Sequence, residues 1–261
     1  MSVVLLNDAI VHYEVLGRGR PVIFLHGWVG SWRYWISSMQ VASTSFRAYA
    51  LDFWGFGGSA QEKNRYSLDG QTKLLDSFLA EMGIGKVALV GHGWGALVAL
   101  NFSIKVPSKV DRVMVTNCPL EPEKLDPRLY TDTTEKLANR FFASIPEAQT
   151  ALTEAKKTDQ DAVLASRNNI DASELFDQVN RQHTPCLLVS GGQDDLVGQP
   201  NPLKLGLSDF GQHIRFENAG YFPMLDSTVT FNRLLTDFLA LDSGLSIKEL
   251  GLKEEWRRRV R

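Results

Sequence analysis

Three glycine-rich segments carry the residue types that could do chemistry, and each follows an apolar run. They are FLHGW at Phe24–Trp28, LDFWGFGGS at Leu51–Ser59 and LVGHGWGA at Leu89–Ala96. Histidine is the usual general acid or base near neutral pH. Glycines allow tight turns and let backbone N–H groups approach a bound oxygen. The three segments therefore predict a ligand site built on the turns that follow strands.

Apolar runs alternate with helical periodicity along most of the chain. Strands are predicted over 10–16, 21–25, 46–51, 86–90, 110–116, 186–190 and 213–217, and helices over 68–82, 94–105 and 229–241. We expect the first two strands to form a hairpin through the turn 17–20. The alternation predicts an α/β protein with a mostly parallel central sheet and helices on both faces. Ligands of such sheets bind beyond the carboxyl ends of the strands.

The order and spacing of the three segments resemble those of the α/β-hydrolase fold family, over nearly the whole chain. The resemblance implies a core formed by residues 1–120 and 183–241. Residues 121–182 are polar and helix-prone without a clear strand, and are predicted to form a small helical cap. Residues 242–261 are predicted to be a charged tail, with six Lys and Arg against three Glu from Ser246 to Arg261.

In that family the third segment is the nucleophile elbow, a sharp strand–turn–helix with Ser, Asp or Cys at its centre. Gly91 and Gly95 match the small flanking residues, but the central position is Gly93. Glycine adopts the strained elbow conformation freely, so the turn is expected to keep its shape. Gly93 offers no hydroxyl, thiol or carboxylate to form a covalent intermediate.

The resemblance also assigns the other two triad positions. The family's acid lies in a pattern like G-x-x-D-x-x-V, which residues 191–197 match with Asp194. The family's histidine lies in a segment like N-A-G-H-F-P, and residues 218–223 have Tyr221 in its place. A phenol with a pKa of about 10 is a poor base near neutral pH. Gly93, Asp194 and Tyr221 are therefore interpreted as a degenerate, vestigial triad.

None of the five histidines stands at the base position. His26 and His92 are common family residues, and we expect them to bond to the backbone and to border the ligand site. His12, His183 and His213 are expected in core or surface roles, and Cys118 is expected to be a buried, inert thiol near the site edge.

Ligand-binding geometry is expected to survive without the triad. The family's oxyanion hole uses two backbone N–H groups, which map onto Trp28 and Trp94. Aromatic residues crowd the same loops, and either fill the core or line an apolar pocket. The predicted ligand-binding residues are Trp28, Trp94, His26, His92 and Trp54.

Composition limits the class of protein. The chain has 28 Lys and Arg against 30 Asp and Glu, for a net charge of −2, so neither nucleic acid nor a membrane is expected as a partner. Two cysteines exclude a disulfide scaffold and favour a cytoplasmic protein. No signal-peptide pattern, transmembrane run or metal-ligand spacing is found, and no cofactor is expected.

Two functions stay open at this point. The first is a pseudo-hydrolase that binds a small apolar or carbonyl-bearing ligand, or a protein partner. Self-association or partner docking through the C-terminal tail belongs to this hypothesis. The second is an enzyme with non-standard chemistry, a lyase, isomerase or non-covalent hydrolase. It would use Asp194, Tyr221 and the backbone oxyanion hole. A third interpretation, that Gly93 and Tyr221 were introduced to trap a substrate, is less favoured because His→Tyr is an unusual choice.

Overall fold

The computed structural model contains an eight-stranded sheet with the strand order β1-β2-β4-β3-β5-β6-β7-β8. The structure describes residues 2–142, 149–167, 175, 178, 181, 184–201, 207, 209–242 and 247–248. The strands are β1 (Ser2–Leu6), β2 (Ala9–Gly17), β3 (Arg20–Leu25), β4 (Phe46–Leu51), β5 (Val87–His92), β6 (Val110–Thr116), β7 (Cys186–Gly191) and β8 (Gly211–Phe216). From β4 to β8 along this order every pairing is parallel, as predicted for an α/β protein.

The predicted hairpin of the first two strands is wrong. β4 lies between β2 and β3, antiparallel to β2 and parallel to β3. The actual hairpin joins β1 and β2 through Asn7 and Asp8, which both have positive φ, at 50° and 65°. Two such residues form the tight turn whose twist matches a two-residue hairpin. β3 is buried along most of its length, which suits an interior parallel strand better than a hairpin arm.

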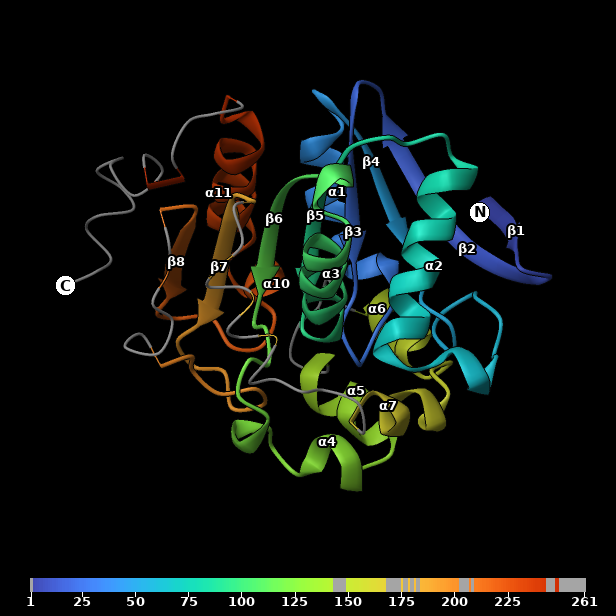
Figure 1. Ribbon diagram of the computed structural model, residues 1–261. Helices are drawn as coiled ribbons and strands as arrows, with labels where there is room; N and C mark the ends of the chain where they lie inside the picture. The colour runs from blue at the N-terminus through green and yellow to red at the C-terminus, as the bar shows by residue number, and fades with distance from the viewer. Residues whose placement is uncertain are drawn as a thin grey trace.

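Helices cover both faces of the sheet. α2 (Leu68–Glu81) and α3 (Trp94–Lys105) lie side by side over one face, and α1 (Ile36–Ala42) packs against α11 (Thr228–Ala240) on the other (Figure 1). Ser67 caps α2 by accepting a hydrogen bond from the Gly70 N–H. α3 is buried almost all round, so its position against β5 and β6 fixes the turn that precedes it.

The segment between β6 and β7 contains short helices at the carboxyl ends of the strands (Figure 1). They are α4 (Arg128–Thr131), α5 (Thr134–Phe142), α6 (Gln149–Ala155) and α7 (Gln160–Arg167). α10 (Pro223–Asp226) follows β8. In the part of the chain described, no helix is long and apolar enough to cross a membrane. The predicted tail lies outside the described residues, except for Asp242, Ile247 and Lys248.

Candidate active site

The turn between β5 and α3 has the geometry of a tight elbow. Gly93 stands at its tip with φ 52° and ψ −115°, and its N–H donates to the Thr116 carbonyl over 2.9 Å. A Cβ at Gly91 would lie 2.5 Å from the Gly95 carbonyl oxygen, and one at Gly95 would lie 2.4 Å from the Leu25 carbonyl oxygen. Both flanking positions therefore require glycine for close backbone approach.

The Tyr221 side chain fills the space in front of Gly93. A Cβ built on Gly93 would lie 2.1 Å from Tyr221 Oη and 3.1 Å from its Cζ, and a Cβ on Gly27 would lie 2.9 Å from Oη. Tyr221 is only 4% exposed. The phenol thus occupies the volume that a side chain at position 93 would need, and any residue larger than glycine would collide with it.

Electrostatics keep the Tyr221 phenol neutral. Burial raises the pKa of Tyr221 well above its usual value, and the nearby Tyr34 and Asp194 raise it further. The Trp28 backbone N–H, which is directed at the phenol oxygen, lowers this pKa in part. The N–H expected to serve as an oxyanion donor therefore already faces an oxygen of the protein itself. The phenol therefore stays protonated near neutral pH and cannot act as a base.

His92 belongs to a hydrogen-bonded chain that holds this arrangement together. Its Nε2 lies 2.7 Å from the Tyr221 carbonyl oxygen, which can only accept, so Nε2 carries the proton. Its Nδ1 then accepts from the Tyr34 hydroxyl, 3.1 Å away, and the Gly27 N–H donates to that hydroxyl. Burial lowers the pKa of His92 to about 3, so the imidazole stays neutral. Tyr34 was identified from sequence only as one of many aromatic residues.

His26 also bonds to the backbone, as expected. Its Nε2 accepts from the Phe53 N–H over 3.0 Å, so its Nδ1 donates to the Gly27 carbonyl, 2.8 Å away. Complete burial lowers the pKa of His26. This side chain joins the turn after β3 to the turn after β4, and it is a scaffold contact rather than an acid or base.

Asp194 is held by three hydrogen bonds after β7. Its Oδ1 accepts from the backbone N–H groups of Leu196 and Val197 at 2.8 and 3.3 Å. Its Oδ2 accepts from Asn117 Nδ2 at 2.6 Å. Burial raises the pKa of Asp194, and these three donors lower it in part. The carboxylate is thus fixed by its donors, and its charge raises the pKa of Tyr221.

Asn117 is a site residue that sequence reasoning missed. It has a positive φ of 46°, and Asn is one of the few side chains that tolerate this conformation. Its position directly after β6 was the available signal, because ligand-site residues follow the strands of such sheets.

The indole rings of Trp28 and Trp94 lie nearly parallel beside the elbow. Their centroids are 6.2 Å apart with an interplanar angle of 28°, and both side chains are fully buried. Trp28 Nε1 donates to Ser166 Oγ of α7 over 2.6 Å. The structure therefore brings these two predicted ligand residues together with Gly93 and Tyr221.

The comparisons with known proteins agree with this geometry. Residues 20–169 match the family described as "alpha/beta hydrolase fold". The chain belongs to the α/β hydrolase fold family. This membership and the mostly parallel sheet confirm the predicted fold class.

Individual relatives of this chain are hydrolases by name. The 2-hydroxy-6-oxo-6-phenylhexa-2,4-dienoate hydrolase of Comamonas testosteroni is 24% identical over 269 residues, which cover 90% of this chain and 92% of that enzyme. The soluble epoxide hydrolase of Corynebacterium sp. strain C12 is 32% identical over 113 residues, which cover 42% of this chain and only 39% of that enzyme. The structure of the enol-lactonase from Burkholderia xenovorans LB400 superposes with a TM-score of 0.78 at 18% identity, covering 92% of this chain and all of that one, and shows the shared fold.

Trp54 lines a different surface from the other predicted ligand residues. It lines a surface hollow of about 290 Å³ together with Asn7, Arg65, Lys73 and the start of α2. Its ring is 2% exposed, and the Arg65 guanidinium lies 5.2 Å from its centroid. Its backbone is bound by the Gln71 side chain through two hydrogen bonds of 3.1 and 3.0 Å. These contacts give Trp54 a packing role between the turn after β4 and α2.

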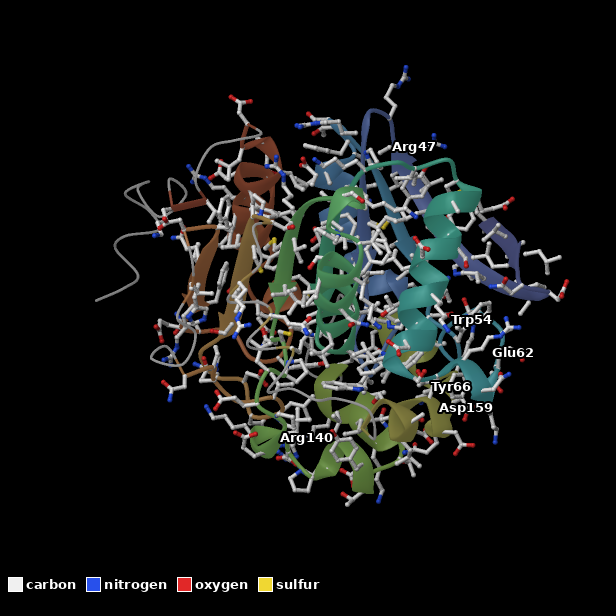
Figure 2. All side chains as sticks on the ribbon, viewed as in Figure 1. Arg47, Trp54, Glu62, Tyr66, Arg140 and Asp159 are labelled. Carbon is white, nitrogen blue, oxygen red and sulfur yellow. The ribbon has the colours of Figure 1, made fainter. Side chains whose placement is uncertain are left out.

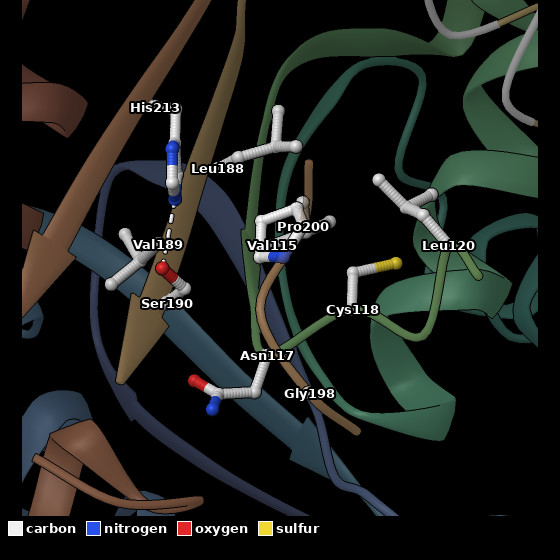
Figure 3. Close-up of a pocket in the computed structure, with 10 residues that line it drawn as sticks. All are labelled: Val115, Asn117, Cys118, Leu120, Leu188, Val189, Ser190, Gly198, Pro200 and His213. Carbon is white, nitrogen blue, oxygen red and sulfur yellow. Dashed lines mark hydrogen bonds between the residues drawn. The ribbon is translucent and has the colours of Figure 1, made fainter. Parts of the chain in front are cut away.

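A second polar cluster joins β7 and β8 beside the segment that follows β6 (Figure 3). Ser190 Oγ and His213 Nε2 are 2.8 Å apart and line a cavity of about 10 Å³ with Asn117 and Cys118. This volume suits about one water molecule. Burial lowers the pKa of His213 to about 4 and raises the pKa of Cys118 well above its usual value, so the thiol stays protonated. His183 lies outside the described residues.

His12 forms a buried pair with Asp52 away from the elbow. His12 Nδ1 lies 2.8 Å from Asp52 Oδ2, and the same carboxylate accepts from the backbone N–H groups of Trp32 and Gly58, at 2.9 Å each. The hydrogen bond to Asp52 raises the pKa of His12, against the effect of burial. Among the residues that the structure describes, no group of three His, Cys, Asp or Glu could hold a metal ion.

Two kinds of contact attach the cap helices to the core. At one end, Tyr66 donates to Asp159 over 2.8 Å, and the Asp159 N–H donates to the Gly55 carbonyl over 2.8 Å. Toward the other end, Arg128 and Arg140 donate to Asp195 at 3.1 and 3.0 Å in a solvent-exposed cluster. Figure 2 labels Tyr66 and Asp159 at the first end and Arg140 at the second. The first end thus has partly buried hydrogen bonds next to the exposed Lys63–Asp161 pair. The second end combines exposed ion pairs with a 2.8 Å hydrogen bond from the Asp126 N–H to the Leu196 carbonyl.

Proposed function

We propose that this α/β hydrolase lacks triad chemistry and binds a small apolar or carbonyl-bearing molecule. One observation supports this above all others: the Tyr221 oxygen lies 2.1 Å from where a Cβ of residue 93 would be. The loss of the base and the loss of the nucleophile are coupled. The base position holds the neutral Tyr221 phenol, and this phenol leaves no room for a nucleophilic side chain at Gly93. Acyl transfer through a covalent intermediate then has neither its attacking atom nor its base.

Ligand binding is supported by what surrounds the elbow. The Trp28 and Trp94 rings, the Tyr221 ring and Phe222 give the site an aromatic, apolar character. A few polar groups at the strand ends would fix the orientation of a bound molecule, as in most small-molecule sites. A protein partner is the alternative occupant, and the charged tail expected to dock it is largely outside the described residues.

A second candidate function is supported by the proximity of two acidic groups. Asp194 and Tyr221 are both buried, and the charge of Asp194 raises the pKa of Tyr221. A neutral phenol beside a carboxylate can donate a proton to a bound substrate, as a lyase or isomerase requires. In this alternative, Tyr221→Phe would abolish turnover.

The experiment is a turnover screen of the purified chain with p-nitrophenyl esters, an epoxide and a haloalkane. We expect rates equal to those without protein, and no mass shift after treatment with a fluorophosphonate probe. Tyr221→Phe is the matched control, because it removes only the hydroxyl and keeps the ring. Saturable turnover that Trp94→Ala abolishes would contradict the binding proposal, and turnover lost in Tyr221→Phe would favour the second candidate.

A further inference from the structure

The paired indoles beside the elbow differ in their hydrogen bonding. Trp28 Nε1 donates to Ser166 of the cap, whereas Trp94 Nε1 has no acceptor among the residues that the structure describes. Trp94 is nevertheless fully buried. A buried N–H without an acceptor costs about 1–3 kcal/mol. A ligand could therefore supply the hydrogen-bond acceptor that the Trp94 indole N–H lacks.

The position of Trp94 suits an oxygen acceptor. It is the first residue of the 12-residue helix α3, directly after Gly93, and it stacks beside Trp28. The amino end of a helix carries partial positive charge, which favours an oxygen with partial negative charge. The side chain and the helix end thus both favour a hydrogen-bond acceptor.

Charge at the site distinguishes a carbonyl from a carboxylate. Asn117 Nδ2 donates to Asp194 Oδ2 over 2.6 Å and to the carbonyl of Gly220, the residue before Tyr221, over 3.4 Å, so the carboxylate lies beside the Tyr221 segment. The ionised Asp194 carboxylate would repel the carboxylate of a bound ligand, because the site is poorly solvated. A neutral carbonyl oxygen accepts the same hydrogen bond without this penalty.

We propose that the Trp94 indole N–H is the donor that binds a neutral carbonyl group on an aromatic or apolar body. This inference rests on the proposed function, and it names the ligand class and the side chain that selects it. The Trp28 and Tyr221 rings contact the apolar body, and the Trp94 Nε1–H donates to the carbonyl oxygen. Molecules without an acceptor lose this hydrogen bond, and carboxylates meet the field of Asp194.

The test compares three probes of similar size, acetophenone, ethylbenzene and benzoate, by ligand-observed NMR titration of the full chain. We expect acetophenone to bind about tenfold more tightly than either of the others. Trp94→Phe should lower acetophenone affinity about tenfold and leave ethylbenzene affinity unchanged. Trp35→Phe is the matched control, because Trp35 is also fully buried with an unpartnered Nε1 but packs against Phe24 and Phe231.

A second measurement needs no variant. In the wild-type chain labelled with ¹⁵N-tryptophan, acetophenone should shift the Trp94 indole N–H resonance, and ethylbenzene should not. Equal affinity of Trp94→Phe and wild type for acetophenone, equal binding of acetophenone and ethylbenzene, or no binding at about 1 mM would each overturn the inference. Ester turnover by the wild-type chain would instead contradict the proposed function, so the two failures are distinguishable.

Discussion

The two sides of the proposed triad site differ in what surrounds them. After β7, Asp194 keeps a complete set of donors from Asn117, Leu196 and Val197. After β5, the elbow keeps its backbone geometry, but the volume before Gly93 is filled by Tyr221. The hydrogen bonds and turns that would position reactive groups are thus present on both sides, and under the proposed function the reactive groups themselves are missing from the side of the elbow. This difference indicates that the scaffold of a site and its reactive atoms can change independently.

The largest effect is expected from restoring the reactive side. Gly93→Ser with Tyr221→His should give esterase activity at least about 100-fold above the wild-type rate. The physical reason is that removing the phenol frees the Trp28 N–H and the elbow volume, while Asp194 is already placed to orient a histidine. Hydrolysis of p-nitrophenyl acetate measures it.

Adding Asp194→Asn to the double variant is the control and should remove most of the gained activity. A folded but silent double variant would contradict the comparison, because it would mean that the scaffold has changed as well.

The next effect is on stability. Gly93→Ala should lower the free energy of unfolding by about 3 kcal/mol, from the φ of 52° together with the collision with Tyr221 Oη. In the Tyr221→Phe background the nearest ring atom is Cζ at 3.1 Å, so the same substitution should cost at least about 1 kcal/mol less. Urea unfolding of the four chains measures this coupling.

Gly83→Ala separates the backbone cost from the collision. Gly83 has a φ of 66°, and a Cβ at this position would meet no other atom within 4 Å. Alanine there should therefore cost about 1 kcal/mol with or without the Tyr221 hydroxyl. If the effects of Gly93→Ala and Tyr221→Phe on the free energy of unfolding were additive, the phenol would not exclude a side chain at the elbow.

A smaller effect tests the acid side. Asn117→Ala should destabilise the protein by about 2 kcal/mol, because it removes a hydrogen bond to a carboxylate and leaves alanine at a φ of 46°. Asn117→Gly keeps the conformation and should show only the loss of the hydrogen bond. Equal stability of Asn117→Ala and wild type, measured by urea unfolding, would mean that Asp194 is held by the backbone N–H groups alone.

The smallest effect concerns the pH dependence of stability, and it compares the pKa of His92 at the elbow with that of His12. NMR titration should show a pKa above 6.5 for His12, raised by its hydrogen bond to Asp52, while His92, with a pKa of about 3, stays neutral. Because the folded pKa of His12 is raised, its stabilising effect is fully present below about 6.5 and is lost as the pH rises through the folded value. The stability advantage of wild type over His12→Gln should therefore shrink from pH 5.5 to pH 8, and a growing advantage would contradict this.

Much of the fold could be predicted from the sequence because its signals are local. The tight elbow at Gly93 and the strands and helices around it follow from glycine spacing and apolar periodicity. The pairing of β2 could not be predicted. A turn at residues 17–20 does connect β2 to β3, but β4 lies between these two strands, and such a long-range pairing leaves no signal in the local sequence. β1 was missed although Val3–Leu6 is apolar, because a run of only four residues gives a weak signal and does not show that it forms an edge strand with one exposed face.

The candidate site could be predicted only for residues that a local sequence motif identifies. Asp194 and Tyr221 were found by motif, but the contact of Tyr221 with Gly93 depends on two segments far apart in sequence. Tyr34 bridges Gly27 and His92 because η1 (Trp32–Trp35) folds back after its Trp32 N–H binds Asp52. Trp54 was predicted as a ligand residue from its glycine-rich loop, yet Gln71 and Arg65 hold it at another surface.

The uneven attachment of the cap has a kinetic consequence. The end held by Tyr66, Asp159 and the Trp28–Ser166 hydrogen bond must break buried and partly buried contacts to open. The other end opens by separating the exposed pairs of Asp195 together with the backbone hydrogen bond from Asp126 to Leu196. Salt screens exposed pairs much more than buried ones. A neutral ligand should therefore associate faster as ionic strength increases, by a route past Asp195.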